Sequence, residues 1–118
     1  MQLTTINNLD EAQACFDQES VLVFFGSAWC QPCQHQLDIL ATLPDGPQVG
    51  PTGYQVDVEE FESLAQRFHI EGLPTLIWFQ QGAEVCRSIG VQSAATLNGM
   101  IEMHNRQQFE KKGDSHAM

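Results

Sequence analysis

The hydrophobic and polar positions in the first part of the chain predict a strand, a helix and a second strand. Residues 3–6 suit a short edge strand. Asn8 offers an N-terminal cap, and the apolar residues that follow recur at helical spacing, which predicts a helix over residues 9–17. Residues 21–25 form a continuous run of β-branched and aromatic side chains. Such a run is typical of a strand that is covered on both faces.

The middle of the chain continues this alternation of helices and strands. Apolar residues from Cys33 onward occupy one helical face, and residues 44–47, with two prolines and a glycine, are expected to end that helix. Residues 53–58 are a candidate strand. Residues 59–68 place apolar side chains among charged ones at helical spacing, and Gly72–Pro74 breaks the pattern.

The last part of the chain predicts a hairpin and a final helix. Residues 75–79 and 84–89 are β-prone runs on either side of a Gln-Gln-Gly-Ala turn. Ser93 caps a final amphipathic helix. We expect one domain over residues 1–108 and a flexible polar tail over residues 109–118.

The resulting order of elements is βαβαβαββα, which predicts an α/β fold. Strands separated by helices pair in parallel through right-handed crossovers, whereas the terminal hairpin adds an antiparallel edge. Helices then flank a central mixed sheet on both faces. A chain of 118 residues suits one such domain with its own hydrophobic core.

The charge of the chain is strongly acidic and unevenly distributed. The formal net charge is −10, and all five Lys and Arg residues follow position 66. Such a surface should repel nucleic acid and anionic membranes, and it favours partners with basic patches. An equally good interpretation is that the excess acid simply keeps the protein soluble.

The compartment bears on how the cysteines are interpreted. No apolar run approaches the roughly 20 residues that span a bilayer, and the N-terminus lacks the pattern of a secretory signal. We therefore expect a cytoplasmic protein, where thiols are kept reduced. In that compartment a CxxC pair is more typical of catalysis or metal binding than of a structural disulfide.

The segment Trp29–Cys33, which reads WCQPC, lies where a buried strand leads into a helix. At a helix N-terminus the unpaired backbone N–H groups and the helix dipole favour a thiolate, so Cys30 suits a nucleophile. Cys33 lies one turn further on the same side, and Pro32 is tolerated in a first turn. We expect Cys30 to attack a substrate disulfide and Cys33 to resolve the mixed disulfide.

A metal site is the alternative use of the same pair. A structural zinc site needs further ligands besides one CxxC, and His35 is the nearest candidate to join Cys30 and Cys33. A cluster bridged between two chains would use the same cysteines. A solvated surface position is the simpler interpretation of His35 and of His69, and His104 falls in or near the tail, so we expect no metal.

Several segments occur at the spacings of the thioredoxin family, which the chain resembles over roughly residues 2–105. The motif is similar to the family's Trp-Cys-Gly-Pro-Cys site, with Gln31 in place of Gly. The other similar segments are residues 21–25, Val56–Val58, Gly72–Leu76, Gln81–Gly82 and Ile89–Gly90.

The resemblance implies a thioredoxin fold with a substrate surface beside the cysteines. Leu73 and Pro74 would face the disulfide, and a cis bond before the proline would leave the Leu73 backbone free to pair with an extended substrate. Trp29 and Gly90 would line the same apolar surface. The family has no bound cofactor and works through its redox-active disulfide. It acts on disulfide-containing proteins and takes electrons from a thioredoxin-reductase-type donor, and we expect a monomer.

Two departures from the family pattern bear on activity. Phe24 stands where the family usually keeps a buried Asp that is thought to assist proton transfer to and from Cys33. No Lys precedes Lys111 to replace the Lys that commonly accompanies that Asp. We therefore expect slower turnover. Gln31 is neutral, which favours the reducing direction.

The residues predict a thiol–disulfide oxidoreductase that mainly reduces protein disulfides through Cys30 and Cys33. The alternative is a thioredoxin-fold binding or assembly factor whose redox pair is vestigial or regulatory, and Phe24 and the acidic surface support it. Cys15 is interpreted as a small core residue. Cys86 is interpreted as an inert thiol on a strand.

Overall fold

The computed structural model describes residues 1–44 and 51–117, with side chains described as far as residue 106. Its elements are β1 (Leu3–Thr5), α1 (Leu9–Phe16), β2 (Ser20–Gly26), α2 (Gln31–Ala41), β3 (Thr52–Asp57), α3 (Glu62–Arg67), β4 (Thr75–Gln80), β5 (Ala83–Ile89) and α4 (Ala94–Ala117). This order confirms the predicted βαβαβαββα succession.

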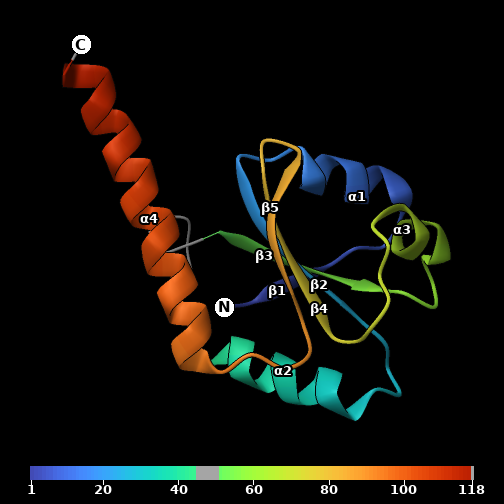
Figure 1. The fold of residues 1–118 in the computed structure, drawn as a ribbon. Coiled ribbons are helices and arrows are strands. Elements are labelled where there is room, and N and C mark those ends of the chain that lie inside the picture. Colours follow the sequence, from blue (N-terminus) through green and yellow to red (C-terminus); the bar gives the residue numbers. More distant parts are fainter. Residues whose placement is uncertain (45–50, 118) are drawn as a thin grey trace.

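The strands form one mixed sheet in the order β1-β3-β2-β4-β5. β3 pairs in parallel with both β1 and β2, while β4 runs antiparallel to β2 and β5 antiparallel to β4. Helices α1 and α3 lie on one face, and α2 and α4 lie on the other (Figure 1). The motif with the two cysteines follows the carboxyl end of β2. This strand is the central one and is hydrogen-bonded to a neighbour on each side, so it gives the site a firm base.

Alternation along the strands divides the core into two layers. In β2, Val21, Val23 and Phe25 pack toward α1 and α3, whereas Leu22 and Phe24 pack toward α2 and α4. All five side chains are buried, as expected for a strand covered on both faces. The layer under α2 and α4 also contains both cysteines of the motif.

Two predicted boundaries differ from the structure by several residues, whereas the bounds of the predicted strands agree to within one residue. The helix predicted over residues 59–68 begins only at Glu62, because the Asp57 carboxylate accepts a hydrogen bond from the Glu59 N–H and holds a turn there. Helix α4 continues to Ala117 through the segment predicted as a flexible tail. Of the predicted stop after α2, residues 45–47 lie outside the described residues; the helix itself ends at Ala41. Within the part of the chain that the structure describes, no helix is long and apolar enough to cross a membrane.

Candidate active site

Cys30 and Cys33 form a disulfide at the start of α2, with their Cα atoms 5.2 Å apart. Cys30 is the N-cap of the helix, and its Sγ accepts a hydrogen bond of 3.2 Å from the Cys33 N–H. Cys30 is 6% exposed, whereas Cys33 is completely buried. A partner that approaches from solvent therefore reaches Cys30 before Cys33, and the Cys33 N–H bonds to the Cys30 sulfur.

The first turn of α2 presents the rest of the motif to solvent. Gln31 and Pro32 are exposed, and Pro32 lies in the first turn, where its missing N–H leaves no helical bond unmade. Trp29 is 69% exposed, and its indole N–H donates to the Glu59 carboxylate at 2.5 Å. An exposed indole held beside a redox pair offers a flat apolar surface to a partner.

The segment before β4 forms the neighbouring part of the site. The Leu73–Pro74 bond is cis, as the resemblance implies, and Leu73 packs against the cluster that contains both cysteines. Thr75 donates its hydroxyl to the Gly72 carbonyl at 2.6 Å, which closes the turn. The N–H of Gly90 donates to the Pro74 carbonyl at 2.8 Å. Gly90 has φ of +88°, a conformation that glycine adopts readily.

These bonds place the predicted site residues in one region of the molecule. Gly90 is tied to Pro74, Leu73 packs on the cluster of the disulfide, and Trp29 directly precedes Cys30.

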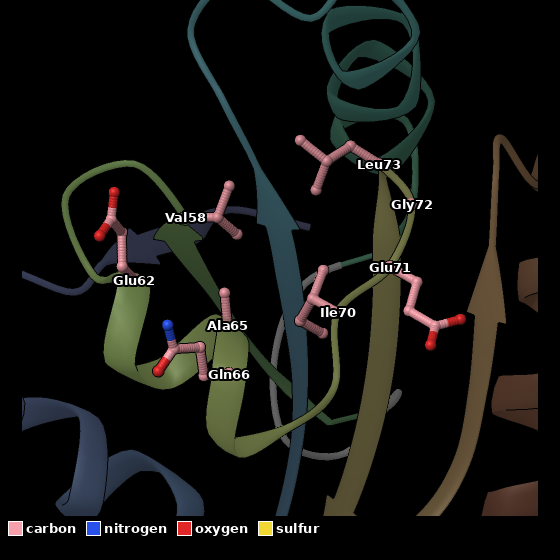
Figure 2. A pocket seen from close by; sticks show the side chains of 8 residues that line it. All are labelled: Val58, Glu62, Ala65, Gln66, Ile70, Glu71, Gly72 and Leu73. Carbon is pink, nitrogen blue, oxygen red and sulfur yellow. The ribbon is translucent and has the colours of Figure 1, made fainter.

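A hollow of about 360 Å³ lies beside Leu73, between α3 and the turn before β4 (Figure 2). Its lining residues are Val58, Glu62, Ala65, Gln66, Ile70, Glu71, Gly72 and Leu73. In Figure 2 the apolar side chains of Val58, Ile70 and Leu73 surround the hollow, while Glu62 and Glu71 stand at opposite edges with their carboxylates turned outward. The hollow is therefore an apolar depression with an acidic rim.

The rim of this hollow has one described arginine acting on it, because the raised pKa of Arg87 reflects its hydrogen bond to Glu84 and, in smaller part, the Glu71 carboxylate. Arg87 is paired with Glu84 at 2.6 Å, and the hydrogen bond from Arg87 lowers the pKa of that carboxyl. Arg67 lies over the Phe68 ring at 4.8 Å. Glu62 and Glu71 therefore form an acidic rim, in which Arg87 partly balances the charge of Glu71.

Phe24 lies behind the disulfide. Its ring is almost completely buried and opposes Gln55 of β3 in the sheet register. A Cβ atom added at Gly26 would lie 2.6 Å from the Phe24 ring and 3.1 Å from the Cys33 sulfur. The ring and the buried sulfur thus converge on the same glycine, and Phe24 contributes an apolar wall on this side of Cys33.

The other two cysteines lack these features. Cys15 is buried on α1, as predicted, and burial raises the pKa of its thiol to about 12. Cys86 is exposed on β5, and desolvation of its thiol, together with the nearby Glu84 carboxylate, raises its pKa. A raised pKa disfavours the nucleophilic thiolate.

The described histidines differ in their surroundings. His35 and His69 are exposed, as predicted. His104 lies on α4 and packs against Trp78, a contact that the sequence did not predict, with ring centroids 4.7 Å apart. Among the described residues, no group of three or more His, Cys, Asp or Glu side chains is arranged to hold a metal ion.

Two further residues beside the site were missed by the sequence reasoning. Glu59 follows the predicted strand over residues 53–58, and nothing in the sequence around it indicates a hydrogen bond to Trp29. Gln36 carried a usable signal, since an amide stands on the buried face of α2 between Cys33 and Leu40.

Comparison with known proteins extends the likeness over most of the chain. A family model described as Thioredoxin matches residues 3–103. A thioredoxin-like protein of Synechocystis is 38% identical over 83 residues, which cover 70% of this chain and 79% of that protein. Thioredoxin-2 of Saccharomyces cerevisiae is 32% identical over 94 residues, covering 80% of this chain and 88% of that protein.

Solved structures agree on the architecture. Thioredoxin of Malassezia sympodialis gives a TM-score of 0.77 at 24% identity, over 88% of this chain and 91% of that chain. Oxidised thioredoxin of Plasmodium falciparum gives 0.76 at 21% identity, over 88% and 99%. At these identities the solved structures show the thioredoxin fold alone. Membership of the family is shown by the family model and by the sequence relatives. The chain belongs to the thioredoxin family.

Proposed function

We propose that this protein is a thiol–disulfide oxidoreductase that mainly reduces disulfides in other proteins. The observation that carries the proposal is the Cys30–Cys33 disulfide at the N-terminus of α2, with Cys30 on the solvent side and Cys33 buried. This arrangement supplies an accessible attacking sulfur and a protected resolving sulfur one turn away.

The reaction proceeds by two exchanges. In the reduced protein, the Cys30 thiolate attacks one sulfur of the substrate disulfide, and the other sulfur leaves as a thiolate that takes up a proton. Cys33 then loses its proton and attacks the Cys30 sulfur, which releases the second substrate thiol and forms the Cys30–Cys33 disulfide. The substrate gains two electrons and two protons, and a dithiol donor of the thioredoxin-reductase type restores the pair.

The substrate surface is built from the apolar residues around the Cys30 sulfur. We assign Trp29, Leu73 and Gly90 to this surface, with Gln31 and Pro32 shaping the turn between the cysteines. An extended substrate segment would pair with the backbone of Leu73. The adjacent hollow would take an apolar side chain of that segment, and its acidic rim favours a substrate with Lys or Arg nearby.

Insulin reduction with dithiothreitol as electron source tests the activity. The wild type should accelerate precipitation of the reduced insulin chains, and Cys30→Ser should abolish the acceleration. Cys33→Ser should accumulate a mixed disulfide with substrate, whereas Cys86→Ser should retain activity. If wild type and Cys30→Ser give the same rate, the reductase assignment fails.

The second candidate is a binding or assembly factor with a vestigial or regulatory redox pair. Phe24 supports it, since an apolar ring behind Cys33 offers no group for proton transfer. A Cys30→Ser/Cys33→Ser variant that still captures the same partners as wild type would favour this role. Under either role we propose a cytoplasmic monomer.

A further inference from the structure

Gln36 is a completely buried amide that joins α2 to the segment between β5 and α4. Its Nε2 donates to the Gln92 carbonyl at 3.2 Å, and its Oε1 accepts from the Gln92 N–H at 2.7 Å. Figure 1 shows this segment passing over α2 on its way to α4. One side chain thus satisfies both backbone groups of a residue 56 positions away.

The two bonds fix the segment in distance and in orientation. A single hydrogen bond allows rotation about its axis, whereas a reciprocal pair holds the backbone of Gln92 in one plane relative to the amide. A buried amide without hydrogen-bond partners is unfavourable, so the bonded arrangement is preferred over a detached one.

The other end of the same segment is fastened to the turn before β4. The Gly90 N–H donates to the Pro74 carbonyl at 2.8 Å, so residues 90–92 are held at one end by Pro74 and at the other by Gln36. Val91 lies between the two attachments and is 37% exposed. Residues 90–92 therefore form a short segment that is fixed at both ends, with Gly90 and Val91 on its solvent side.

Gln36 also follows Cys33 by one helical turn, and both side chains are completely buried on the same face of α2. The helix that carries the disulfide is in this way bonded directly to a segment of the surface beside it. A change in the Gln36 bonds would move that segment relative to the cysteines without altering either sulfur.

We propose that Gln36 is a positioning residue. It holds residues 90–92 in the position relative to α2 that lets a protein substrate contact this segment and reach Cys30. This inference rests on the proposed function. A protein disulfide lies in a chain that contacts this segment as it approaches, whereas a small disulfide needs only the Cys30 sulfur. Gln36 therefore contributes to recognition of protein disulfides and is dispensable for small ones.

The test compares two substrates, insulin and the neutral small molecule bis(2-hydroxyethyl) disulfide. Gln36→Leu has a similar volume and neither hydrogen bond, and it should raise KM for insulin by about tenfold, the effect of losing roughly 1.4 kcal/mol of binding. Its kcat for insulin and its rate with the small disulfide should stay within about twofold of wild type. Gln36→Met, with an unbranched side chain of similar length, is the second variant.

Two controls separate positioning from general destabilisation. Gln34→Leu makes the same change at an exposed position of α2 and should behave as wild type. Val23→Ala removes buried volume from the opposite face of the sheet, and its loss of stability should leave KM unchanged. All variants are assayed at a temperature where circular dichroism shows them folded.

The outcomes distinguish the inference from the function on which it rests. A rise in KM for insulin alone, in both Gln36 variants, supports the inference. Equal effects on both substrates, no effect on either, or the same rise in Val23→Ala would overturn it. A wild type that reduces neither substrate overturns the proposed function, and the inference with it.

Discussion

The Trp29 indole N–H donates to the Glu59 carboxylate at 2.5 Å, joining the loop before α2 to the loop after β3. Trp29 is among the most exposed large apolar side chains in the described structure, so its position depends on this bond more than on packing. Glu59 thereby sets the orientation of the indole next to the reactive pair. A carboxylate acceptor makes the bond stronger than a neutral one would.

Replacing Glu59 with Ala should release the indole without unfolding the protein. The change in the free energy of unfolding should stay below about 1 kcal/mol, because both groups are exposed to water. The indole N–H resonance of Trp29 in the NMR spectrum should shift and broaden, and KM for insulin should rise. Glu60→Ala is the matched control, since Glu60 is a neighbouring exposed carboxylate. An unchanged indole resonance in Glu59→Ala would contradict this role.

Charge reversal at the rim of the hollow should change which substrates are preferred. In Glu62→Lys/Glu71→Lys, kcat/KM should fall severalfold for a disulfide peptide flanked by Lys and Arg and should rise for one flanked by Asp and Glu. Both effects should shrink at high ionic strength, because salt screens exposed charges.

The control for the double variant reverses the charge of a carboxylate that lies away from the hollow. Glu102→Lys changes an exposed carboxylate on α4 and tests net charge alone. If Glu102→Lys shifts the peptide preference as much as the double variant does, the preference arises from overall charge and not from the hollow.

Much of the fold could be predicted from the sequence because its signals are local. Residues 21–25 and 75–79 are runs of mainly apolar side chains, which is enough to predict buried strands. The motif at the start of α2 is contiguous in the sequence, so it could be recognised without knowledge of the tertiary structure. Asn8 and Ser93 also cap the helices as predicted, through the Glu11 and Thr96 N–H groups.

The parts that could not be predicted depend on contacts between distant residues. Gln36 meets Gln92 only because the chain returns over α2 after the hairpin, so the sequence can mark Gln36 as an amide on the buried face but cannot identify its partner. His104 was placed in or near the tail, and its contact with Trp78 could not be foreseen because it depends on the direction of α4 relative to β4. Such placements follow from the packing of whole elements, which short patterns do not specify.

An ionised carboxylate at position 24 should destabilise the fold at neutral pH. Phe24→Asp loses a buried aromatic ring and buries a charge, so the free energy of unfolding should fall by more than about 3 kcal/mol. Burial holds the pKa of such a carboxyl above its unfolded value, so the destabilisation should lessen as the pH falls and the group becomes neutral. Urea unfolding at neutral and acidic pH measures both effects.

Phe24→Asn separates the charge from the lost volume. It removes the same ring without adding an ionisable group, so its destabilisation relative to wild type should not vary with pH through this group. If Phe24→Asp is as stable as wild type, or if its deficit is the same as that of Phe24→Asn at every pH, then position 24 does not lie in the apolar surroundings described above.

His104 should make the docking of α4 sensitive to mild acid. Its Nδ1 contacts the Gln80 amide at 2.5 Å, and its Nε2 contacts the Ser20 hydroxyl at 3.3 Å, so the neutral ring joins α4 to β2 and β4. Burial lowers the pKa of His104 below the ordinary value of 6.5, while the Glu19 carboxylate acts in the opposite direction. The folded protein therefore resists protonation at a pH where the unfolded chain accepts it. The stability from this group is present at neutral pH, begins to decline below about pH 6.5 and continues to decline down to the folded pKa.

The variant His104→Phe isolates this effect, since a phenyl ring can still stack on Trp78 but cannot titrate. Urea unfolding from about pH 7.5 to about pH 5.5 should show wild type losing more stability than His104→Phe over that interval. Removing the hydrogen bonds should cost the variant about 1 kcal/mol at the upper end of the range, so the two stabilities should converge as the pH falls. Divergence, with wild type gaining relative stability in acid, would mean that the folded pKa lies above 6.5 and that Glu19 outweighs burial.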